Sequence, residues 1–390
     1  MTAFKSFLML VFYHFLGISI LDLQKYSHLL QKSKLNPSRY GEIGLFNLGK
    51  PNIGGNIKEN PEDFIVEEIP SYQPCGSGDH LFLWIEKKLL SADELVSHIS
   101  RQLNISSRDV GVAGKKDRVA VTRQFISVPK KVESKLSAVD SDSVKILSVK
   151  PHPNKLTIGH LQGNFFNIIV RDIQVKHLSQ IEAIFQNIDK NGFPNFFGPQ
   201  RFGKQRDTAE IGFKILNGDT DKLSKRWLNK TGKKFALSAA QSFLFNRYLL
   251  RRMVELGLDK LLDGDVVFKK SGGIFKVEDF DQEKIRFDSG ELIPAGPIFG
   301  KKTYKSAKAA LDFENEILAE SNILREKFSE FGKMMLGTRR PIFCFPENFS
   351  YSIENQNLTL NFGLKAGSYA TVLLSEFSRP SDIYDYSVNL

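Results

Sequence analysis

Apolar and polar positions alternate in several short stretches of the chain, as they do in strands with one buried face. After the turn-forming Asn-Pro pair of segment 60–70, Phe64, Val66 and Glu68 recur at a period of two. The segment HLFLWIEKK at 80–88 is a second run of strand-forming residues. The pattern therefore predicts strands at 60–70 and 80–88.

Other stretches have apolar residues at helical spacing. Ser91 is a residue type that caps helices, and the apolar positions after it share one face: Leu95, Val96, Ile99 and Leu103. Further helices are expected in the amphipathic stretch 177–188, in 233–257 with small residues in its first turns, and in the charged stretch 306–323. The chain thus mixes helices with strands.

The order of these stretches predicts an α+β fold with more than one unit. Segment 155–172 is expected to hold two β-rich runs separated by a Gly-Asn break, and 261–279 a hairpin that bends at Ser-Gly-Gly. Helices and a hairpin of its own indicate a separate unit over 208–338. Segment 358–377 returns to strand and helix and is expected to rejoin the first unit.

The first forty residues differ from the rest. The apolar run at 7–21 is shorter than the roughly 18 residues of a membrane span. No small-residue cleavage site follows it, so a secretory signal is not expected. We interpret 1–40 either as an appended helix or as the product of an upstream start codon, in a protein that neither spans a membrane nor is secreted.

The composition of the chain indicates the kind of partner that it can bind. The chain has 54 Lys and Arg against 44 Asp and Glu, a formal charge of +10, which favours a polyanionic partner. It also has 32 Phe, and aromatic side chains among basic ones suit RNA, although most Phe residues fill cores. Composition alone therefore permits an RNA-binding protein and does not establish one.

Metals and common cofactors have no support in the sequence. With only Cys75 and Cys344, a disulfide framework is not expected, and a reducing cytoplasm fits. The seven His residues lack metal-ligand spacing. The stretch AGPIFGKKT at 295–303 is one residue too short for a phosphate-binding P-loop, and no dinucleotide-binding glycine fingerprint is present. We expect no metal and no nucleotide cofactor.

Two segments carry candidate chemistry. In VGVAGKKDRVAVTRQFISV at 110–128, one carboxylate, Asp117, stands between Lys115, Lys116 and Arg118. Such a basic segment is most often a solvated turn. Alternatively, the cations lower the pKa of an aspartate that works in an apolar pocket.

The second segment is GFPNFFGPQRFG at 192–203, which is too rich in Gly and Pro for regular structure. Asn195 can hydrogen-bond a ligand, Phe197 can stack on a base and Arg201 can contact phosphate. A buried aromatic turn explains the segment equally well.

Six motifs in order resemble the TruD family of pseudouridine synthases, which isomerise a uridine in tRNA. They are NPEDFIVEE at 60–68, AGKKDRVAVTRQ at 113–124, KLTIGHLQGNFF at 155–166, PNFFGPQRFG at 194–203, ALSAAQSFLFN at 236–246 and AGSYATVLL at 366–374. The resemblance covers about 41 to 385 and does not include 1–40. Lys115 stands where the family often has an uncharged residue.

The resemblance implies a fold and a reaction. The fold is a pseudouridine-synthase catalytic domain with a mixed, mainly antiparallel sheet over 41–207 and 339–390, interrupted by an α+β insertion domain at 208–338. RNA would lie in a cleft between the two domains. The reaction needs neither cofactor nor metal: the uracil is detached from ribose, turned and reattached through carbon.

It also implies the site residues. Asp117 matches the catalytic aspartate, Phe64, Asn195 and Tyr369 match positions that contact the target nucleotide, and Phe197 matches a ring that packs on the base. The family commonly has Phe in place of Tyr369. Cations near the aspartate would keep it ionised, and the candidates are Lys58, Lys116 and Arg118.

The expected function is therefore a cytoplasmic, monomeric tRNA pseudouridine synthase, an isomerase, acting at position 13 in the D arm. Two alternatives remain: a pseudouridine synthase acting on another RNA site, and a non-catalytic RNA-binding protein on the same scaffold. In the insertion, Arg251 and Arg252 are expected to contact RNA phosphates if they face the cleft.

Overall fold

The structure is a computed structural model. It describes residues 53–114, 116, 118–203 and 207–377, so the N-terminal segment 1–40 lies outside the described residues. The described chain forms two compact units: the sheet unit, 53–181 and 346–370, and the helical unit, 182–345 and 371–377. The expected boundaries of an insertion at 208–338 stay a prediction.

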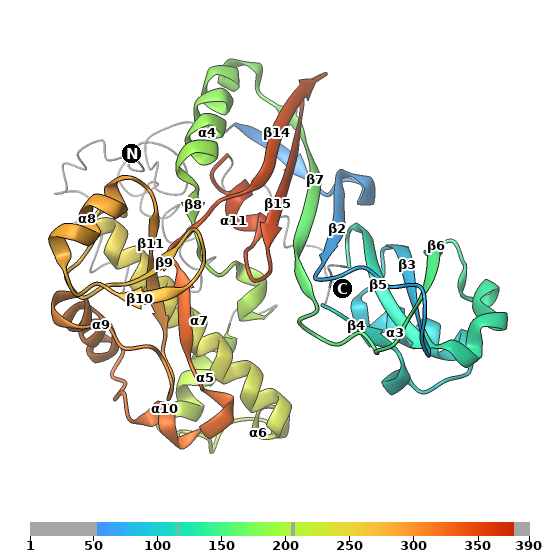
Figure 1. Cartoon of the computed structure of the whole chain (residues 1–390), viewed down its shortest axis with the longest axis horizontal. Helices are drawn as coiled ribbons and strands as arrows, with labels where there is room; N and C mark the ends of the chain where they lie inside the picture. Colours follow the sequence, from blue (N-terminus) through green and yellow to red (C-terminus); the bar gives the residue numbers. More distant parts are fainter. Residues whose placement is uncertain (1–52, 115, 117, 204–206, 378–390) are drawn as a thin grey trace. The chain divides into compact units, whose positions relative to one another are not determined.

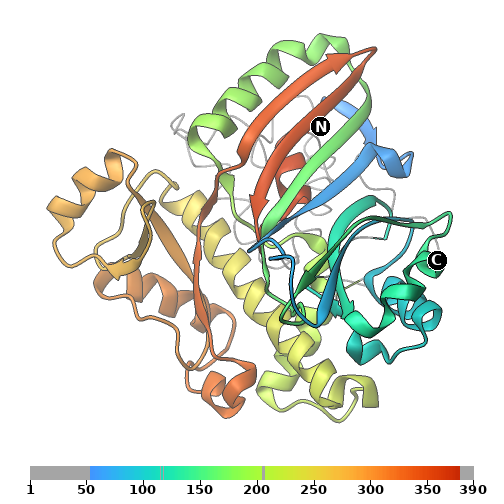
Figure 2. The ribbon, with the colours of Figure 1, turned by 45° about the vertical axis from the view of Figure 1, so that its right-hand side comes forward.

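A mixed sheet forms the centre of the sheet unit. Its described strands, in spatial order, are β14 (Glu347–Glu354), β15 (Asn357–Lys365), β7 (Leu161–Ile173), β2 (Phe64–Pro70), β5 (Val121–Pro129), β3 (His80–Lys88) and β6 (Val144–His152). Two short strands join it, β1 (Gly54–Ile57) beside β7 and β4 (Gly111–Val112) beside β5. β2 and β5 are parallel, and the other pairs are antiparallel (Figures 1 and 2). The expected mixed, mainly antiparallel sheet is confirmed.

The expected strands at 60–70 and 80–88 are confirmed as β2, which follows a short 3-10 turn, and β3. The expected break within 155–172 is wrong, because β7 runs through Gly163 and Asn164 without interruption. A Cβ on Gly163 would lie 2.2 Å from the carbonyl oxygen of Leu364 on β15. Gly163 therefore allows close approach of a neighbouring strand rather than ending one.

One face of the sheet is covered by α3 (Ala92–Leu103) and a 3-10 helix at Lys130–Val139. Ser91 caps α3 as expected: its hydroxyl accepts from the N–H of Glu94, and the Glu94 carboxylate accepts from the N–H of Ser91. The apolar side chains between helix and strands are fully buried: Leu81, Leu83, Ile85, Leu95, Ile99, Leu103 and Ile126. Burial of this stripe holds α3 on β3 and β5.

The helical unit is organised around the long helix α7 (Lys230–Glu255), drawn in yellow in Figure 2. It packs against α5 (Thr208–Asn217), α9 (Lys308–Glu320) and β11 (Leu292–Ile298). A Cβ on Gly212 of α5 would lie 2.1 Å from the carbonyl oxygen of Ala236, so the small residues at the start of α7 allow close helix packing, as expected. The expected helices at 233–257 and 306–323 are confirmed.

The unit also contains two small sheets. One has the order β10 (Ile274–Lys276), β9 (Val266–Lys269), β11 and β12 (Thr338–Pro341), and the other pairs β13 (Phe343–Cys344) with β8 (Phe193–Pro194). β9 and β10 form the expected hairpin. The shorter helices are α6 (Lys225–Leu228), α8 (Phe280–Asp288) and α10 (Lys327–Glu330); α4 (Leu178–Asn191) and α11 (Ala370–Leu374) each begin in the sheet unit and continue into the helical unit.

A buried ion pair fixes the start of β2. Asp63 is fully buried and receives two hydrogen bonds, of 2.9 and 2.6 Å, from the guanidinium of Arg171 on β7. Its carboxylate also accepts from the N–H of Asn60. Burial raises the pKa of Asp63, but the hydrogen bonds from Arg171 and Asn60 outweigh it and leave the pKa below its ordinary value.

We expect Asp63→Asn to lower the free energy of unfolding at neutral pH by about 1–2 kcal/mol, because the amide cannot accept both charged hydrogen bonds. A lowered folded-state pKa adds stability above the unfolded value of 3.8 that is lost as pH falls through the folded value. Denaturant unfolding of wild type and variant should therefore differ at neutral pH and converge in acid.

Asp172→Asn is the matched control, because Asp172 is exposed and its φ of 56° suits Asn. Equal losses in both variants, or a loss that does not change with pH, would contradict the role given to Asp63.

Candidate active site

The predicted nucleophile, Asp117, and its neighbour Lys115 lie outside the described residues. Lys116 and Arg118, on either side of Asp117, are described. They differ sharply in environment, and this difference separates the two cations that the sequence left as equivalent candidates.

Lys116 is buried in the sheet unit. Its ammonium lies 3.2 Å from the carboxylate of Glu68 on β2, and the two side chains are 5% and 1% exposed. It also donates a hydrogen bond to the side-chain oxygen of Asn164 on β7. Glu68 and Asn164 are directly opposite each other in the β2–β7 register, so two strands hold one cation.

Burial raises the pKa of the Glu68 carboxyl, and the charge of Lys116 opposes this in part. On β5, which pairs with β2, the polar residues Thr122 and Gln124 are also fully buried. Charges are costly in such a place unless they are paired. The ion pair therefore requires a fixed position for Lys116, next to Asp117 in the chain.

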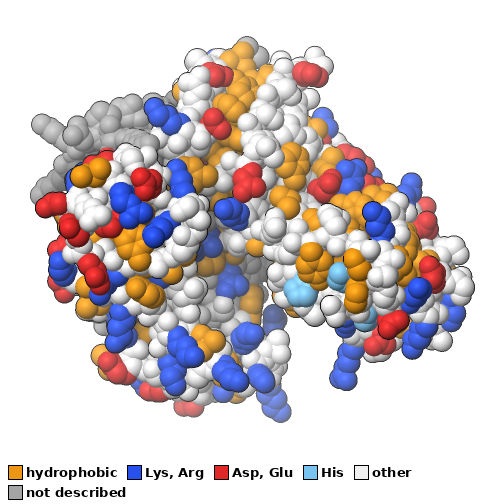
Figure 3. Space-filling view, viewed as in Figure 1, with side chains coloured by type: hydrophobic (Ala, Val, Ile, Leu, Met, Phe, Trp, Pro, Cys, Tyr) orange, Lys and Arg blue, Asp and Glu red, His pale blue; other side chains and the backbone are white. Residues whose placement is uncertain are grey.

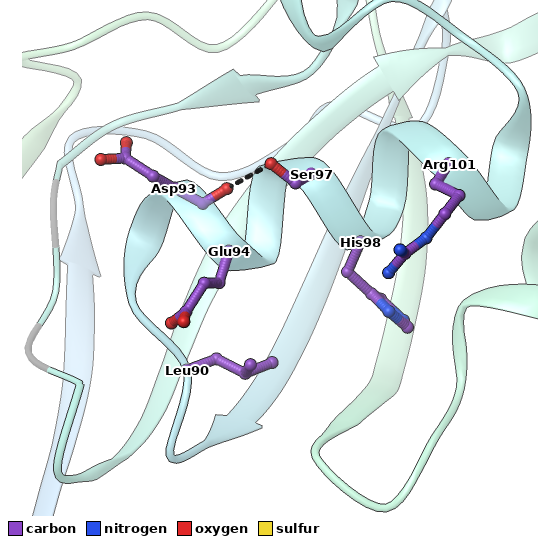
Figure 4. A pocket seen from close by; sticks show the side chains of 6 residues that line it. All are labelled: Leu90, Asp93, Glu94, Ser97, His98 and Arg101. Carbon is purple, nitrogen blue, oxygen red and sulfur yellow. Dashed lines mark hydrogen bonds between the residues drawn. The ribbon is translucent and has the colours of Figure 1, made fainter. Parts of the chain in front are cut away.

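Arg118 is directed differently. Its guanidinium lies 3.7 Å from the carboxylate of Glu94 on α3, and both side chains are nearly half exposed. Such a pair contributes little to stability. Figure 4 shows Glu94 on α3 with the other residues that line a shallow pocket, Leu90, Asp93, Ser97, His98 and Arg101. Of the predicted site residues that the structure describes, none lines this pocket.

Lys58 and Phe64 lie together at the start of β2. The ammonium of Lys58 is 4.1 Å from the centre of the Phe64 ring, a cation–π contact. The ring is 1% exposed and meets Phe166 of β7 edge-on. Lys58 has a φ of 62°, a left-handed conformation that is uncommon for Lys. Tyr369, in the same unit, is half-buried just before α11.

Asn195 and Phe197 belong to the helical unit, where Arg340 of β12 contacts both. The guanidinium of Arg340 donates to the side-chain oxygen of Asn195 at 2.6 Å and to its backbone oxygen at 2.9 Å. The Asn195 amide donates to the carbonyl oxygen of Pro341 at 3.0 Å. Asn195 is therefore held with its side-chain oxygen against a cation.

Arg340 also lies over the ring of Phe197, 4.1 Å from its centre. The backbone N–H and C=O of Phe197 are both bound by the side chain of Asn246 on α7, at 2.8 and 3.0 Å. Segment 192–203 is thus a rigid turn that is braced from β12 and α7. Arg340 is a residue that the sequence reasoning missed, because nothing in the sequence links it to Asn195, which is 145 positions away.

Three arginines expected to meet RNA have protein partners instead. Arg201 donates to the hydroxyl of Ser242 at 2.9 Å and also to that of Ser238. Arg252 is fully buried, paired with Asp265 at 2.6 Å and bonded to Tyr248, whose pKa burial raises to about 12.

Arg251 is 11% exposed and lies against Glu255, Glu316 and Glu320. The expectation that Arg251 and Arg252 contact phosphate is wrong, because both belong to ion pairs within the helical unit.

No described helix is both long and apolar enough to cross a membrane. Within the same residues, His, Cys, Asp and Glu side chains form no group of three that could hold a metal ion. Cys75 is exposed and Cys344 is buried.

Comparison with known proteins gives the family. The sequence model of tRNA pseudouridine synthase D (TruD) matches residues 42–234 and 224–377. A protein described as tRNA pseudouridine synthase D from Thermus thermophilus is 37% identical over 329 residues, which cover 84% of this chain and 89% of that protein. This chain belongs to the TruD family. Pseudouridine synthases are isomerases, so the expected enzyme class is confirmed.

Two further TruD proteins are similar to this chain over most of its length. One from Campylobacter jejuni is 36% identical over 366 residues, covering 85% of this chain and 95% of that protein. The crystal structure of a TruD protein from Methanosarcina mazei aligns with a TM-score of 0.67 at 24% identity, over 85% of this chain and 95% of the other. The likeness confirms the TruD fold.

We expect Glu68→Gln to destabilise the protein by about 3 kcal/mol, because the carboxylate no longer offsets the cost of burying the Lys116 ammonium. The double variant Glu68→Gln, Lys116→Met should recover part of the loss, since it removes the buried charge. Chemical denaturation measures both. Glu62→Gln is the control: Glu62 forms an exposed pair with Lys88, and its loss should change stability little. Equal effects of the two Glu substitutions would contradict a buried pair.

Proposed function

We propose that this chain isomerises a uridine of tRNA to pseudouridine, with Asp117 as the nucleophile and position 13 in the D arm as the target. The observation that carries the proposal is the buried Lys116 beside Asp117, within a segment that matches the TruD motif. The curated relatives described as tRNA pseudouridine synthase D support tRNA as the substrate.

The chemistry needs an ionised carboxylate in a pocket that excludes water. Burial alone would raise the pKa of such a carboxyl and favour its neutral form. A cation fixed next to it in the chain opposes this. We assign that role to Lys116, which is buried, rather than to Arg118, which pairs with Glu94 near the surface.

The reaction is balanced without a cofactor. The bond from the ribose carbon to the uracil nitrogen breaks, a bond to a uracil carbon forms, the hydrogen on that carbon leaves as a proton, and the nitrogen gains one. No atom is lost overall. Aspartate suits this reaction because it can bond to carbon and leave again.

The same proposal assigns substrate contacts. Asn195 would meet the uracil edge through the amide hydrogen and the oxygen lone pair that its bonds to Pro341 and Arg340 do not use, and Phe197, which Arg340 also contacts, offers a ring on which a base can stack. Phe64, with Lys58 above it, and Tyr369 contribute from the sheet unit. The few kcal/mol needed to extrude the uridine from its stack would be offset in part by stacking on the Phe197 ring.

The proposal includes the setting of the reaction. The chain has only two cysteines, Cys75 and Cys344, far apart in sequence, which suits a reducing cytoplasm, where tRNA is modified. We also propose a monomer, with an insertion domain at 208–338 that binds RNA and contributes no catalytic group.

The test is Asp117→Asn, assayed for pseudouridine formation on an unmodified tRNA transcript under single-turnover conditions. Asn has the shape of Asp without the anionic nucleophile, so product formation should be lost while tRNA affinity is retained or increased. Asp142→Asn, at an exposed turn before β6, removes the same charge and should react like wild type.

Near-native product formation by Asp117→Asn would overturn the assignment of the nucleophile. Binding of tRNA without product by the wild-type protein would favour the non-catalytic alternative.

A further inference from the structure

An exposed basic segment in the helical unit has no role so far. It spans α6 and the first turns of α7, and its cations are Lys222, Lys225, Arg226, Lys230, Lys233 and Lys234. We call these six residues, together with Trp227 and Phe235, the basic patch. Figure 3 shows Lys and Arg side chains along the lower edge of the view, where α6 and the start of α7 lie.

The six cations have no carboxylate partner within 4 Å among the described residues. Several other cations of the unit have such a partner. Lys284 pairs with Asp288 at 2.5 Å, Arg286 with Glu283 at 2.7 Å, and Arg251 with three glutamates. Cations without carboxylate partners on one short segment create a positive electrostatic potential, which attracts an anionic partner.

Two aromatic rings lie among these cations. The rings of Trp227 and Phe235 are nearly parallel, at 7°, with centres 6.4 Å apart. Phe235 is 39% exposed, and the guanidinium of Arg226 lies 4.9 Å from the centre of the Trp227 ring. An aromatic ring that is exposed to water is solvated unfavourably. Its position among cations therefore indicates a ligand that has both negative charge and flat apolar faces.

The patch is also held in place. A Cβ on Gly232 would lie 2.1 Å from the carbonyl oxygen of Arg226, so α6 packs closely on the first turn of α7. Asn229 caps α7 by accepting from the N–H of Gly232 at 2.8 Å. The first turn of α7 has no acidic residue, and its N–H groups add a partial positive charge.

We propose that the basic patch is an RNA-binding surface of this protein: its cations bind backbone phosphates, and Trp227 with Phe235 stacks on an unpaired base. Phosphates at nucleotide spacing suit a row of lysines, and bases supply the flat faces. The proposal rests on tRNA as the substrate. It replaces Arg251 and Arg252 as the phosphate-binding cations of this unit.

The experiment measures tRNA affinity over a range of salt concentrations for Lys225→Gln, Arg226→Gln. We expect weaker binding at low salt. The slope of log affinity against log salt concentration should be smaller by about 1.5, because the loss of two phosphate contacts reduces the number of counterions released on binding. The double variant Lys284→Gln, Arg286→Gln is the control: it removes the same two charges where they are paired with carboxylates, and it should bind like wild type.

The aromatic part has its own test. Phe235→Leu should weaken tRNA binding by about tenfold, equally at low and high salt, because stacking is not electrostatic. If a variant is poorly folded by circular dichroism, Lys230→Gln, Lys234→Gln tests the same surface from α7.

Wild-type affinity and salt slope in both charge variants of the patch would overturn the proposal, as would an equal loss in the control. This failure differs from failure of the proposed function. If only the proposed role of the basic patch is wrong, the patch variants bind tRNA and form pseudouridine as the wild-type protein does. If the proposed function is wrong, the wild-type protein forms no pseudouridine.

Discussion

The buried ion pair between Glu68 and Lys116 is the constraint on which the site depends. A charged pair in the interior is tolerated only when its geometry is fixed, because desolvation costs several kcal/mol per ion. The sheet meets this requirement by placing β2 between a parallel strand, β5, and an antiparallel one, β7. Glu68 and Asn164 then face one another, and Lys116 binds both. The segment before Asp117 is thereby held by the centre of the sheet.

Two groups of cations in this basic chain have different environments. Arg171, Arg251, Arg252 and Arg340 are bound by protein groups and hold segments together. The six cations of the basic patch lack carboxylate partners among the described residues. Composition cannot separate these groups, because a buried Arg and an exposed Lys count equally. We infer that RNA affinity comes from the second group.

The sequence predicts local elements well and long-range contacts poorly. α3 follows from its cap and its helical spacing, and β3 from a run of strand-forming residues; both signals depend on neighbouring residues. Glu68 stands at an apolar position of its strand, a sign of a buried charge, but its partner Lys116 comes from the segment before β5, far away in the chain. From the local sequence, Gly163 is expected to break the strand. Its close contact with β15 is with residues far away in the chain, which the local sequence does not show. Arg340 and the burial of Arg252 are likewise set by tertiary packing. Asp117 itself lies outside the described residues, and its role rests on motif and family.

The most direct measurement of the central claim is a map of pseudouridine at single-nucleotide resolution in total tRNA from cells with and without this protein. The account predicts that one pseudouridine, at position 13 in the D arm, disappears when the protein is absent and returns with the wild-type chain. Identical maps in the two cell types would contradict the assignment of this chain as a tRNA pseudouridine synthase.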